Sequence, residues 1–341
     1  MEFANTTIKI DYPLRYSTKI IEAPSNHFFN LKKCFYIVDD FFQDRLHLAQ
    51  PFWFSAVEKN KSLSTVQKIL QRLHNNSFQR DDQIVAIGGG ITLDLAAFVS
   101  SIYQRGCRLV LIPTTLVSML DASIGGKTGL NYHYLKNQIG SFYPAHKIIL
   151  DYDFLHSLPP TEVKNGYAEL IKIMIIKDRF FFLQDFTSIN NNLPTFIKKA
   201  IQFKLEFCTP DLLDQNTRQI LNLGHTFAHL LETISKYRIS HGASVAWGLK
   251  CALQISVEKE LLAKDMYQMF ISYLDHFCHI HKLSPKQKTK ITKEGIKILW
   301  ADKKANNLLK LILVNNEAVE IQHFHQEEIQ SILQWLTIDS R

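Results

Sequence analysis

Short apolar runs and helical patterns alternate along the first half of the chain. Residues 84–87, 109–112 and 147–150 are mostly apolar runs with the length of buried strands. A helical pattern follows the first run, so residues 84–112 predict a strand–helix–strand unit. Residues 35–38 form another apolar run, and residues 8–10 alternate as a half-buried strand does. This order of elements is typical of an α/β domain.

The alternation of strands and helices stops after residue 150. Ser157 and Leu158 are followed by two prolines, which predicts a domain boundary near residue 155. Beyond it, helices are expected at 161–184, 193–207, 212–235, 241–262, 265–282 and 285–300. A strand at 308–314 and a helix at 329–336 are expected to end the chain. The fold class is therefore an α/β domain over residues 1–155, followed by a mostly α-helical domain over residues 156–341.

Composition narrows the class of protein. The chain has 341 residues, enough for two domains, and its 46% hydrophobic and 21% charged content is globular. The net charge is +7, but the basic residues are dispersed, which favours a small anionic substrate over nucleic acid. Five cysteines lie far apart without a CxxC pair, which favours a reducing compartment. No signal-peptide pattern or long apolar stretch is present, so we expect a cytoplasmic protein without a membrane segment.

Glycine-rich turns follow the first two strands of the strand–helix–strand unit. Gly88–Gly90 stand between a strand and a helix that carries Asp94, and Gly125-Gly126 precede Lys127. Glycine lets a phosphate approach the backbone N–H groups closely. Ordinary turns would also explain the glycines, but two such turns with threonines, acids and lysines favour a ligand-binding crevice. Asp39 ends an earlier strand and is either a ribose-binding acid or a helix N-cap.

One carboxylate and two imidazoles on three helical segments suggest a metal site. Glu169, His225 and His241 suit Zn²⁺ with one coordination position left open. The chain has 14 histidines, however, so pairs arise readily by chance. From the residues alone, His225 and His229, four apart on one helix face, are the favoured pair of ligands.

Several motifs together resemble one known family. GGGITLDLAAF, YQRG, IPTTL, DASIGGKTGLN and LKNQIG, then AELIK, residues 218–229 and DKK, are similar in order and spacing to the 3-dehydroquinate synthase branch of the sugar phosphate cyclases. The resemblance runs from about residue 58 to residue 304. It implies an N-terminal dinucleotide-binding domain and a C-terminal metal- and substrate-binding domain. It also implies a homodimer, catalytic NAD and one divalent metal, Zn²⁺ or Co²⁺.

The implied reaction converts 3-deoxy-D-arabino-heptulosonate 7-phosphate into 3-dehydroquinate and phosphate. Two other kinds of protein remain open: another cyclase or polyol dehydrogenase of the same architecture, and a non-catalytic relative. Arg218 and Asn222 favour the 3-dehydroquinate synthase reaction, because a guanidinium can bind the carboxylate of its substrate through two parallel hydrogen bonds. Cyclases whose substrates lack a carboxylate do not keep this pair.

The resemblance also assigns roles to individual residues. The metal ligands become Glu169, His225 and His241, and His229 passes to the substrate phosphate. The catalytic and substrate-contacting residues are Lys127, Lys172, Asp121, Lys204, Arg218, Asn222 and His229. The phosphate and further substrate contacts are Arg105 (across a dimer interface), Lys136, Asn137 and Lys304. The residues for the dinucleotide are Asp39, Glu58, Lys61, Gly90, Asp94, Thr114, Thr115, Lys136 and Ser157.

The chain departs from the family at a few of these places. Val57, Leu93, Ala97 and Leu135 stand where glycine is usual, and Leu93 is expected to crowd the pyrophosphate loop or the helix–sheet contact. Ala243 follows His241-Gly242 where the family usually has glutamate. If that acid supports a metal ligand, its loss is expected to change metal affinity.

Overall fold

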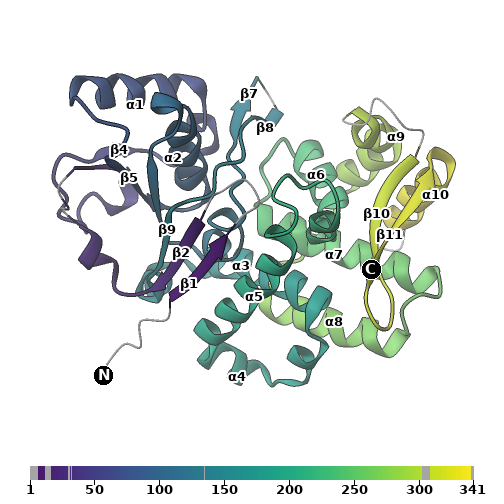
Figure 1. The fold of residues 1–341 in the computed structure, drawn as a ribbon. Coiled ribbons are helices and arrows are strands. Elements are labelled where there is room, and N and C mark those ends of the chain that lie inside the picture. The colour runs from purple at the N-terminus through teal and green to yellow at the C-terminus, as the bar shows by residue number, and fades with distance from the viewer. Residues whose placement is uncertain are drawn as a thin grey trace. The chain divides into compact units, whose positions relative to one another are not determined.

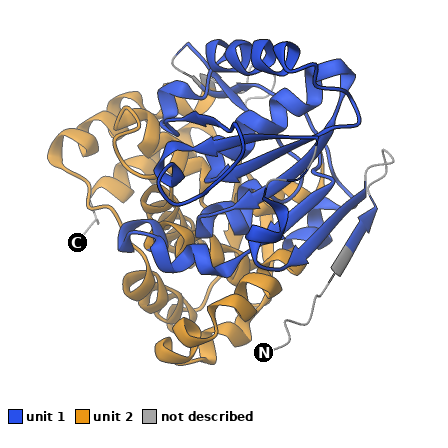
Figure 2. Cartoon of the chain, turned by 90° about the vertical axis from the view of Figure 1, so that its left-hand side faces the viewer, with its two compact units in different colours: residues 1–163, 204–215 blue, residues 164–203, 216–341 orange. Residues whose placement is uncertain are grey.

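The computed structural model describes residues 7–11, 17–29, 31, 33–133, 135–301 and 308–338, and the chain forms two compact units. Unit 1 comprises residues 1–163 and 204–215, and unit 2 comprises residues 164–203 and 216–341 (Figure 2). The domain boundary placed near residue 155 stays a prediction.

Unit 1 is built on a seven-stranded sheet with the order β1-β2-β9-β6-β5-β3-β4. The strands are β1 (Thr7–Asp11), β2 (Ser17–Glu22), β3 (Cys34–Asp39), β4 (Phe52–Phe54), β5 (Gln83–Gly88), β6 (Arg108–Pro113) and β9 (Lys147–Leu150). All neighbouring strands pair in parallel except β1 and β2, which are antiparallel. The strands expected at 84–87, 109–112 and 147–150 are confirmed. Apart from Lys147, which is partly exposed, their side chains are almost fully buried, as the central strands of a parallel sheet require.

Helix α2 (Gly90–Ile102) connects β5 to β6 and packs against both strands, while α1 (Leu63–Asn75) precedes β5 (Figure 1). The turn into α2 needs a glycine. A Cβ at Gly88 would lie 2.5 Å from Thr92 Oγ1, so any side chain there would push the helix away from the strand. A small hairpin of β7 (Leu130–Tyr132) and β8 (Leu135–Ile139) completes the strands of unit 1.

Unit 2 is mainly helical within the described residues. Its helices are α3 (Pro160–Lys177), α4 (Phe186–Asn191), α5 (Leu193–Cys208), α6 (His225–Ile234), α7 (His241–Glu258), α8 (Lys264–Phe277), α9 (Pro285–Ala301) and α10 (Gln326–Ile338). The first residues of α3 and the last residues of α5 belong to unit 1. The strands β10 (Leu308–Val314) and β11 (Val319–His325) form an antiparallel hairpin close to α10 (Figure 1). The fold class expected from the sequence is confirmed.

Several expectations for this half are wrong in detail. The helix expected at 161–184 ends at Lys177, where a short 3-10 helix (Arg179–Leu183) follows, and α4 was not expected. The helix expected at 212–235 does not run without a break: a short 3-10 helix (Thr217–Asn222) is followed by Gly224 with φ +77°, and α6 begins at His225. Glycine adopts this left-handed conformation without strain, so the chain turns there. Strand β11 was not expected. Its sequence, VEIQHFH, is mostly polar, and only Phe324 is buried.

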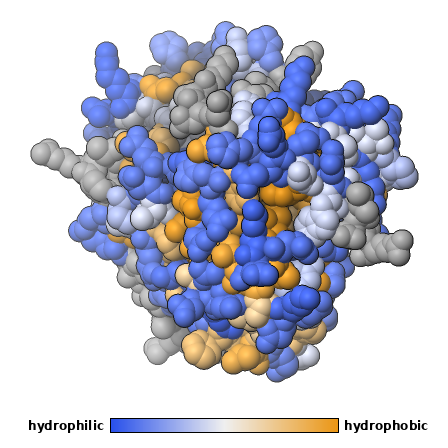
Figure 3. Space-filling view, turned by 90° about the vertical axis from the view of Figure 1, so that its right-hand side faces the viewer, coloured by the Kyte–Doolittle hydropathy of each residue, from blue (hydrophilic) through white to orange (hydrophobic). Residues whose placement is uncertain are grey.

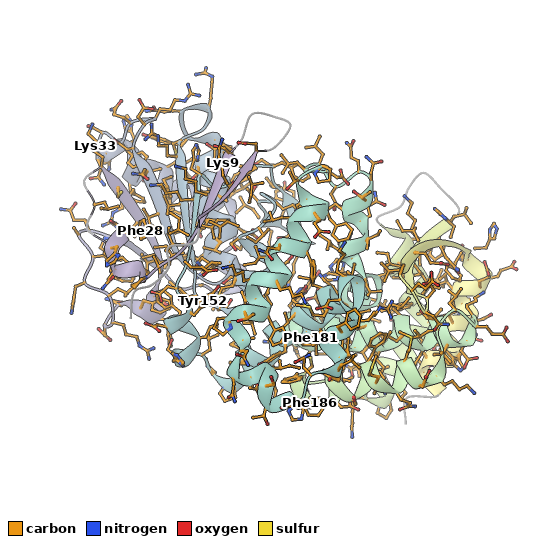
Figure 4. All side chains as sticks on the ribbon, turned by 60° about the horizontal axis from the view of Figure 1, so that its bottom comes forward. Lys9, Phe28, Lys33, Tyr152, Phe181 and Phe186 are labelled. Atoms are coloured by element: carbon orange, nitrogen blue, oxygen red, sulfur yellow. The ribbon has the colours of Figure 1, made fainter. Side chains whose placement is uncertain are left out.

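The core of unit 2 lies among α6, α7, α9, α10 and the β10–β11 hairpin. Its buried members include Phe227, Leu230, Trp247, Leu311 and Leu333. Burying each such side chain stabilises the fold by about 2 kcal/mol. A second, aromatic group lies nearer α4 and α8, where Figure 4 labels Phe181 and Phe186. These two groups fix the helices that carry the candidate site.

Figure 3 shows the face on which β10 and β11 lie in Figure 1. This face is mostly hydrophilic, with apolar side chains gathered along its middle. No helix among the described residues combines the length and the apolar composition needed to cross a membrane.

Candidate functional site

Three helices of unit 2 bring Glu169, His225 and His241 together. Glu169 lies within α3 and is fully buried, while the two histidines are the first residues of α6 and α7. Glu169 Oε1 lies 3.5 Å from His225 Nε2 and 3.2 Å from His241 Nε2. The three ligand atoms all lie within 4.8 Å of one another. Donors bound to one Zn²⁺ ion at 2.0–2.1 Å sit roughly 3.3 Å apart, so the arrangement fits a shared ion.

Close helix packing, made possible by glycine, produces this arrangement. A Cβ at Gly242 would lie 2.2 Å from Asn165 Cα, so α7 rests directly on the backbone of α3. A Cβ at Gly248 would lie 2.1 Å from the Gly224 carbonyl oxygen, so α7 also approaches the start of α6. Ser240 caps α7 and donates a 2.7 Å hydrogen bond to Asn165 Oδ1. Each ligand therefore occupies a fixed helical position.

The buried charges around Glu169 are paired. Lys172 Nζ lies 2.6 Å from Glu169 Oε2, and both side chains are almost fully buried. Oε2 makes no hydrogen bond of good geometry, although it is buried. Burial alone would raise the pKa of Glu169, but the Lys172 charge and the two histidines hold the pKa well below its usual range. An ionised, incompletely bonded carboxylate is suited to receive a cation.

His241 lies between two carboxylates. Its Nε2 faces Glu169, and its Nδ1 lies 3.1 Å from Oε1 of Glu232, which is 3% exposed. Burial alone would lower the pKa of His241, but bonds and charges from Glu169 and Glu232 raise that pKa to about 10. Glu232 was missed in the sequence. The available clue was its position seven residues after His225, which places both on one face of α6.

The alternative ligand pair, His225 with His229, is not the pair that the structure brings to Glu169. His229 is exposed and stands outside the group of three ligand atoms. Its ring centroid lies 5.7 Å from that of His225. The geometry therefore supports the set implied by the family resemblance.

In unit 1, several of the residues expected to bind the dinucleotide form one hydrogen-bonded group. Lys61 Nζ lies 2.5 Å from Asp94 Oδ2 and 2.6 Å from Asn137 Oδ1, and Lys61 is only 5% exposed. Burial raises the pKa of Asp94 in spite of the Lys61 charge. Glu58 accepts a 2.8 Å bond from Asn131 Nδ2 and lies 3.8 Å from Lys136 Nζ. Glu58 and Lys61 are therefore both held by side-chain hydrogen bonds in the folded chain.

The glycine and threonine turns meet where β5 and β6 end. Gly90 begins α2, and the Thr114 N–H donates to the Gly88 carbonyl oxygen at 3.0 Å. Thr115 exchanges hydrogen bonds with Ser118, which closes the turn. Ligands of parallel α/β sheets bind at this edge. Leu93 is fully buried, so its side chain packs in the interior.

Two lysine–aspartate pairs lie in the same unit. Lys204 is 4% exposed; it donates to the Asp121 carbonyl oxygen at 2.8 Å and pairs with the Asp121 carboxylate. Lys127 Nζ lies 2.5 Å from Asp214 Oδ2. Asp214 was also missed: it lies in a turn without periodicity, and its φ of +57° is unusual for a residue with a Cβ.

The remaining candidates belong to both units. In unit 2, Arg218 is 4% exposed, while Asn222 at the end of the same 3-10 helix is exposed. In unit 1, Arg105 is exposed and has φ +64°, a strained conformation of the kind found at functional sites. The Asp39 carboxylate accepts from the Phe41 N–H at 3.2 Å and so caps the short helix that follows, and burial raises its pKa. Ser157 is exposed and donates to the Phe154 carbonyl oxygen. Lys304 lies outside the described residues.

Comparisons with known proteins agree on one family. The family model for the 3-dehydroquinate synthase N-terminal region matches residues 52–165, and the model for the C-terminal region matches residues 166–305. A 3-dehydroquinate synthase of Pelagibacter ubique is 38% identical over 273 residues, which cover 77% of this chain and 73% of the relative. One from Legionella pneumophila (strain Lens) is 38% identical over 266 residues, 75% and 71% of the two chains.

Solved structures share the fold. A 2-deoxy-scyllo-inosose synthase complexed with carbaglucose-6-phosphate, NAD⁺ and Co²⁺ has a TM-score of 0.81 at 22% identity, covering 97% of this chain and 99% of its own. A 2-epi-5-epi-valiolone synthase of Streptomyces hygroscopicus with NAD⁺ and Zn²⁺ bound has a TM-score of 0.78 at 21% identity, covering 99% of both chains. These structures confirm the fold class expected from the sequence, and the family models and curated relatives confirm the resemblance.

Proposed function

We propose that this chain, which belongs to the 3-dehydroquinate synthase family, converts 3-deoxy-D-arabino-heptulosonate 7-phosphate into 3-dehydroquinate and phosphate. The observation that carries the proposal is the Glu169–His225–His241 group, built around a fully buried carboxylate in a chain of this family. The enzyme is a phosphate-eliminating carbon–oxygen lyase that uses NAD catalytically.

Glu169, His225 and His241 would hold Zn²⁺ or Co²⁺. The ionised Glu169 and the two converging Nε2 atoms match the ligand types of these ions. A divalent ion held by these residues would supply Lewis-acid polarisation of substrate oxygens, which would acidify the neighbouring C–H bond. Lys172, buried 2.6 Å from Glu169, supplies a fixed cation beside the ligands. Lys172 therefore adds positive charge where the substrate becomes more anionic.

Arg218 would recognise the carboxylate of the substrate. Its guanidinium presents two parallel N–H donors, and the almost complete burial of Arg218 makes such charge-assisted bonds stronger. Asn222, one turn further on, would add an amide contact. Sugar phosphates without a carboxylate cannot accept these two parallel bonds, so the pair would set substrate specificity.

The group around Lys61 would hold the dinucleotide in unit 1. Glu58, Lys61 and Asp94 offer charged partners for ribose hydroxyls, and the Gly88–Gly90 turn offers backbone N–H groups for the pyrophosphate. The remaining contacts are Asp39, Thr114, Thr115, Lys136 and Ser157. NAD⁺ held by these residues would supply reversible hydride transfer, with no net consumption of the cofactor.

Basic and amide side chains would hold the phosphate. Arg105, Asn137, His229 and Lys304 bind its oxygens, with Arg105 supplied by the second subunit of a homodimer. The departing phosphate itself takes the proton from C6 as the C–O bond to C7 breaks. The ring then opens, and an intramolecular aldol reaction closes the carbocycle. Lys127 and Lys204, each paired with an aspartate, orient the substrate through these steps.

We place the enzyme in the cytoplasm, in keeping with its five free cysteines. The test of the function is phosphate release with a pair of substrates. The metal- and NAD-loaded protein is expected to release phosphate from the heptulosonate phosphate and not from glucose 6-phosphate. Arg218→Ala should remove about 3 kcal/mol of transition-state binding, or roughly 100-fold in kcat/KM. Release from glucose 6-phosphate at a similar rate would instead indicate a different cyclase.

A further inference from the structure

The Glu232 carboxylate is not accounted for by the proposed reaction. It lies in the last turn of α6, is 3% exposed, and faces His241 Nδ1 at 3.1 Å. Burying an ionised carboxylate is costly unless it is paired. Its position next to a candidate ligand therefore indicates a role in the ligand group.

Helix geometry explains how Glu232 reaches this place. His225 and Glu232 are seven residues apart, which is close to two full turns, so they project from the same face of α6. The His241 ring lies along this face, with its centroid 5.6 Å from that of His225. Helix α6 thus provides a ligand at its start and an acid two turns later.

The two nitrogens of His241 have separate partners. Nε2 faces Glu169 Oε1 at 3.2 Å, on the side of the ligand group, and Nδ1 faces Glu232 on the other side. A neutral imidazole carries one N–H, and only the nitrogen without it can bind a metal ion. A carboxylate that accepts from Nδ1–H leaves the Nε2 lone pair free and fixes the plane of the ring.

We propose that Glu232 is a positioning residue for the metal site: it selects the Nδ1–H tautomer of His241 and holds the ring with Nε2 toward Glu169 and His225. The inference rests on the proposed metal site and assigns this chain a supporting acid on α6.

The experiment compares Zn²⁺ affinity in four full-length proteins. Metal-free wild type, Glu232→Ala, Glu232→Gln and Asp178→Asn are titrated with Zn²⁺ against a chromophoric chelator. Asp178 is the matched control, because it is a buried acid of unit 2 (6% exposed) that pairs with Lys199 and not with the ligands. Circular dichroism of each metal-free protein verifies folding.

Glu232→Ala is expected to weaken Zn²⁺ binding about 100-fold and Glu232→Gln about tenfold, with Asp178→Asn unchanged. The amide oxygen of glutamine still accepts from Nδ1–H, but its NH₂ group can also stabilise the wrong tautomer. The visible absorption of bound Co²⁺, which reports ligand geometry, should change in the two Glu232 variants alone.

Folded Glu232 variants that keep wild-type affinity would overturn the inference, and so would an equal loss in Asp178→Asn. The proposed reaction can be refuted independently of this inference. If the wild type binds Zn²⁺ tightly but does not turn over the heptulosonate phosphate, the proposed function is wrong and the role of Glu232 still holds.

Discussion

Replacing Gly242 by alanine should damage the metal site without touching a ligand. A Cβ at this position would lie 2.2 Å from Asn165 Cα and 2.4 Å from its carbonyl oxygen. These are backbone atoms of α3, so no side chain can rotate away. Ordinary carbon–carbon contact is about 3.5 Å, so α7 and α3 must separate by roughly 1.3 Å.

That displacement is large on the scale of metal coordination. Glu169 on α3 and His241 on α7 are 3.2 Å apart, and metal–ligand distances tolerate changes of about 0.2 Å. Overpacking of this kind costs about 1–3 kcal/mol in stability. We therefore expect Gly242→Ala to lose at least about 100-fold in Zn²⁺ affinity and to unfold at a lower temperature.

The chain offers a matched control. Gly295 is also a buried helical glycine of unit 2, but its added Cβ would first meet Leu333 Cδ1, at 2.8 Å. The end of a leucine side chain can shift, and alanine favours a helix over glycine by about 1 kcal/mol. Gly295→Ala should therefore keep its Zn²⁺ affinity in the same chelator competition. Wild-type affinity in Gly242→Ala would refute the claim that helix contact sets the site.

Three further predictions concern charge. Lys61→Met should lower the free energy of unfolding by about 3 kcal/mol near neutral pH, because the largely buried Asp94 carboxylate loses its partner. This loss of stability should shrink on acidification, since burial raises the pKa of Asp94 and its protonation removes the unpaired charge. Denaturant unfolding at several pH values measures this, and a loss that grows in acid would contradict it. Zn²⁺ affinity should rise about tenfold per pH unit below pH 10, because the ion must displace a proton from His241. Burial opposes that proton, but Glu169 and Glu232 stabilise it. An affinity that does not change with pH would show that the His241 ring is neutral in the metal-free protein. Arg218→Lys keeps the charge but not the paired donors, so kcat/KM should fall roughly tenfold or more in steady-state assays, whereas wild-type kinetics would exclude bidentate recognition.

The sequence predicts the elements whose pattern is strong and local. The central strands were recognisable because a parallel sheet buries both faces and so requires continuous apolar runs, as at residues 84–87. Strand β11 was missed because polar residues such as Glu320 and His323 occupy most of it. The break before α6 follows from Gly224, whose left-handed conformation becomes evident only in the folded chain.

The residues of the candidate site were likewise only partly predictable from the sequence. Glu169, His225 and His241 were named through the family resemblance, because the residues alone favoured a pair four apart on one helix. Lys61 looks like a solvated charge until its burial against Asp94, 33 residues away, is seen. Glu232 and Asp214 were missed for the same reason: an acid at a helix end or in a turn is usually solvated, and only tertiary packing gives it a partner.

The most direct test of the proposed function is the amount of 3-dehydroquinate formed per NAD⁺ supplied. Zn²⁺-loaded protein with heptulosonate phosphate in large excess over NAD⁺ should form many molecules of 3-dehydroquinate per NAD⁺, without accumulating NADH. Product limited to one molecule per NAD⁺, with NADH appearing in step, would contradict a returned hydride and indicate a dehydrogenase.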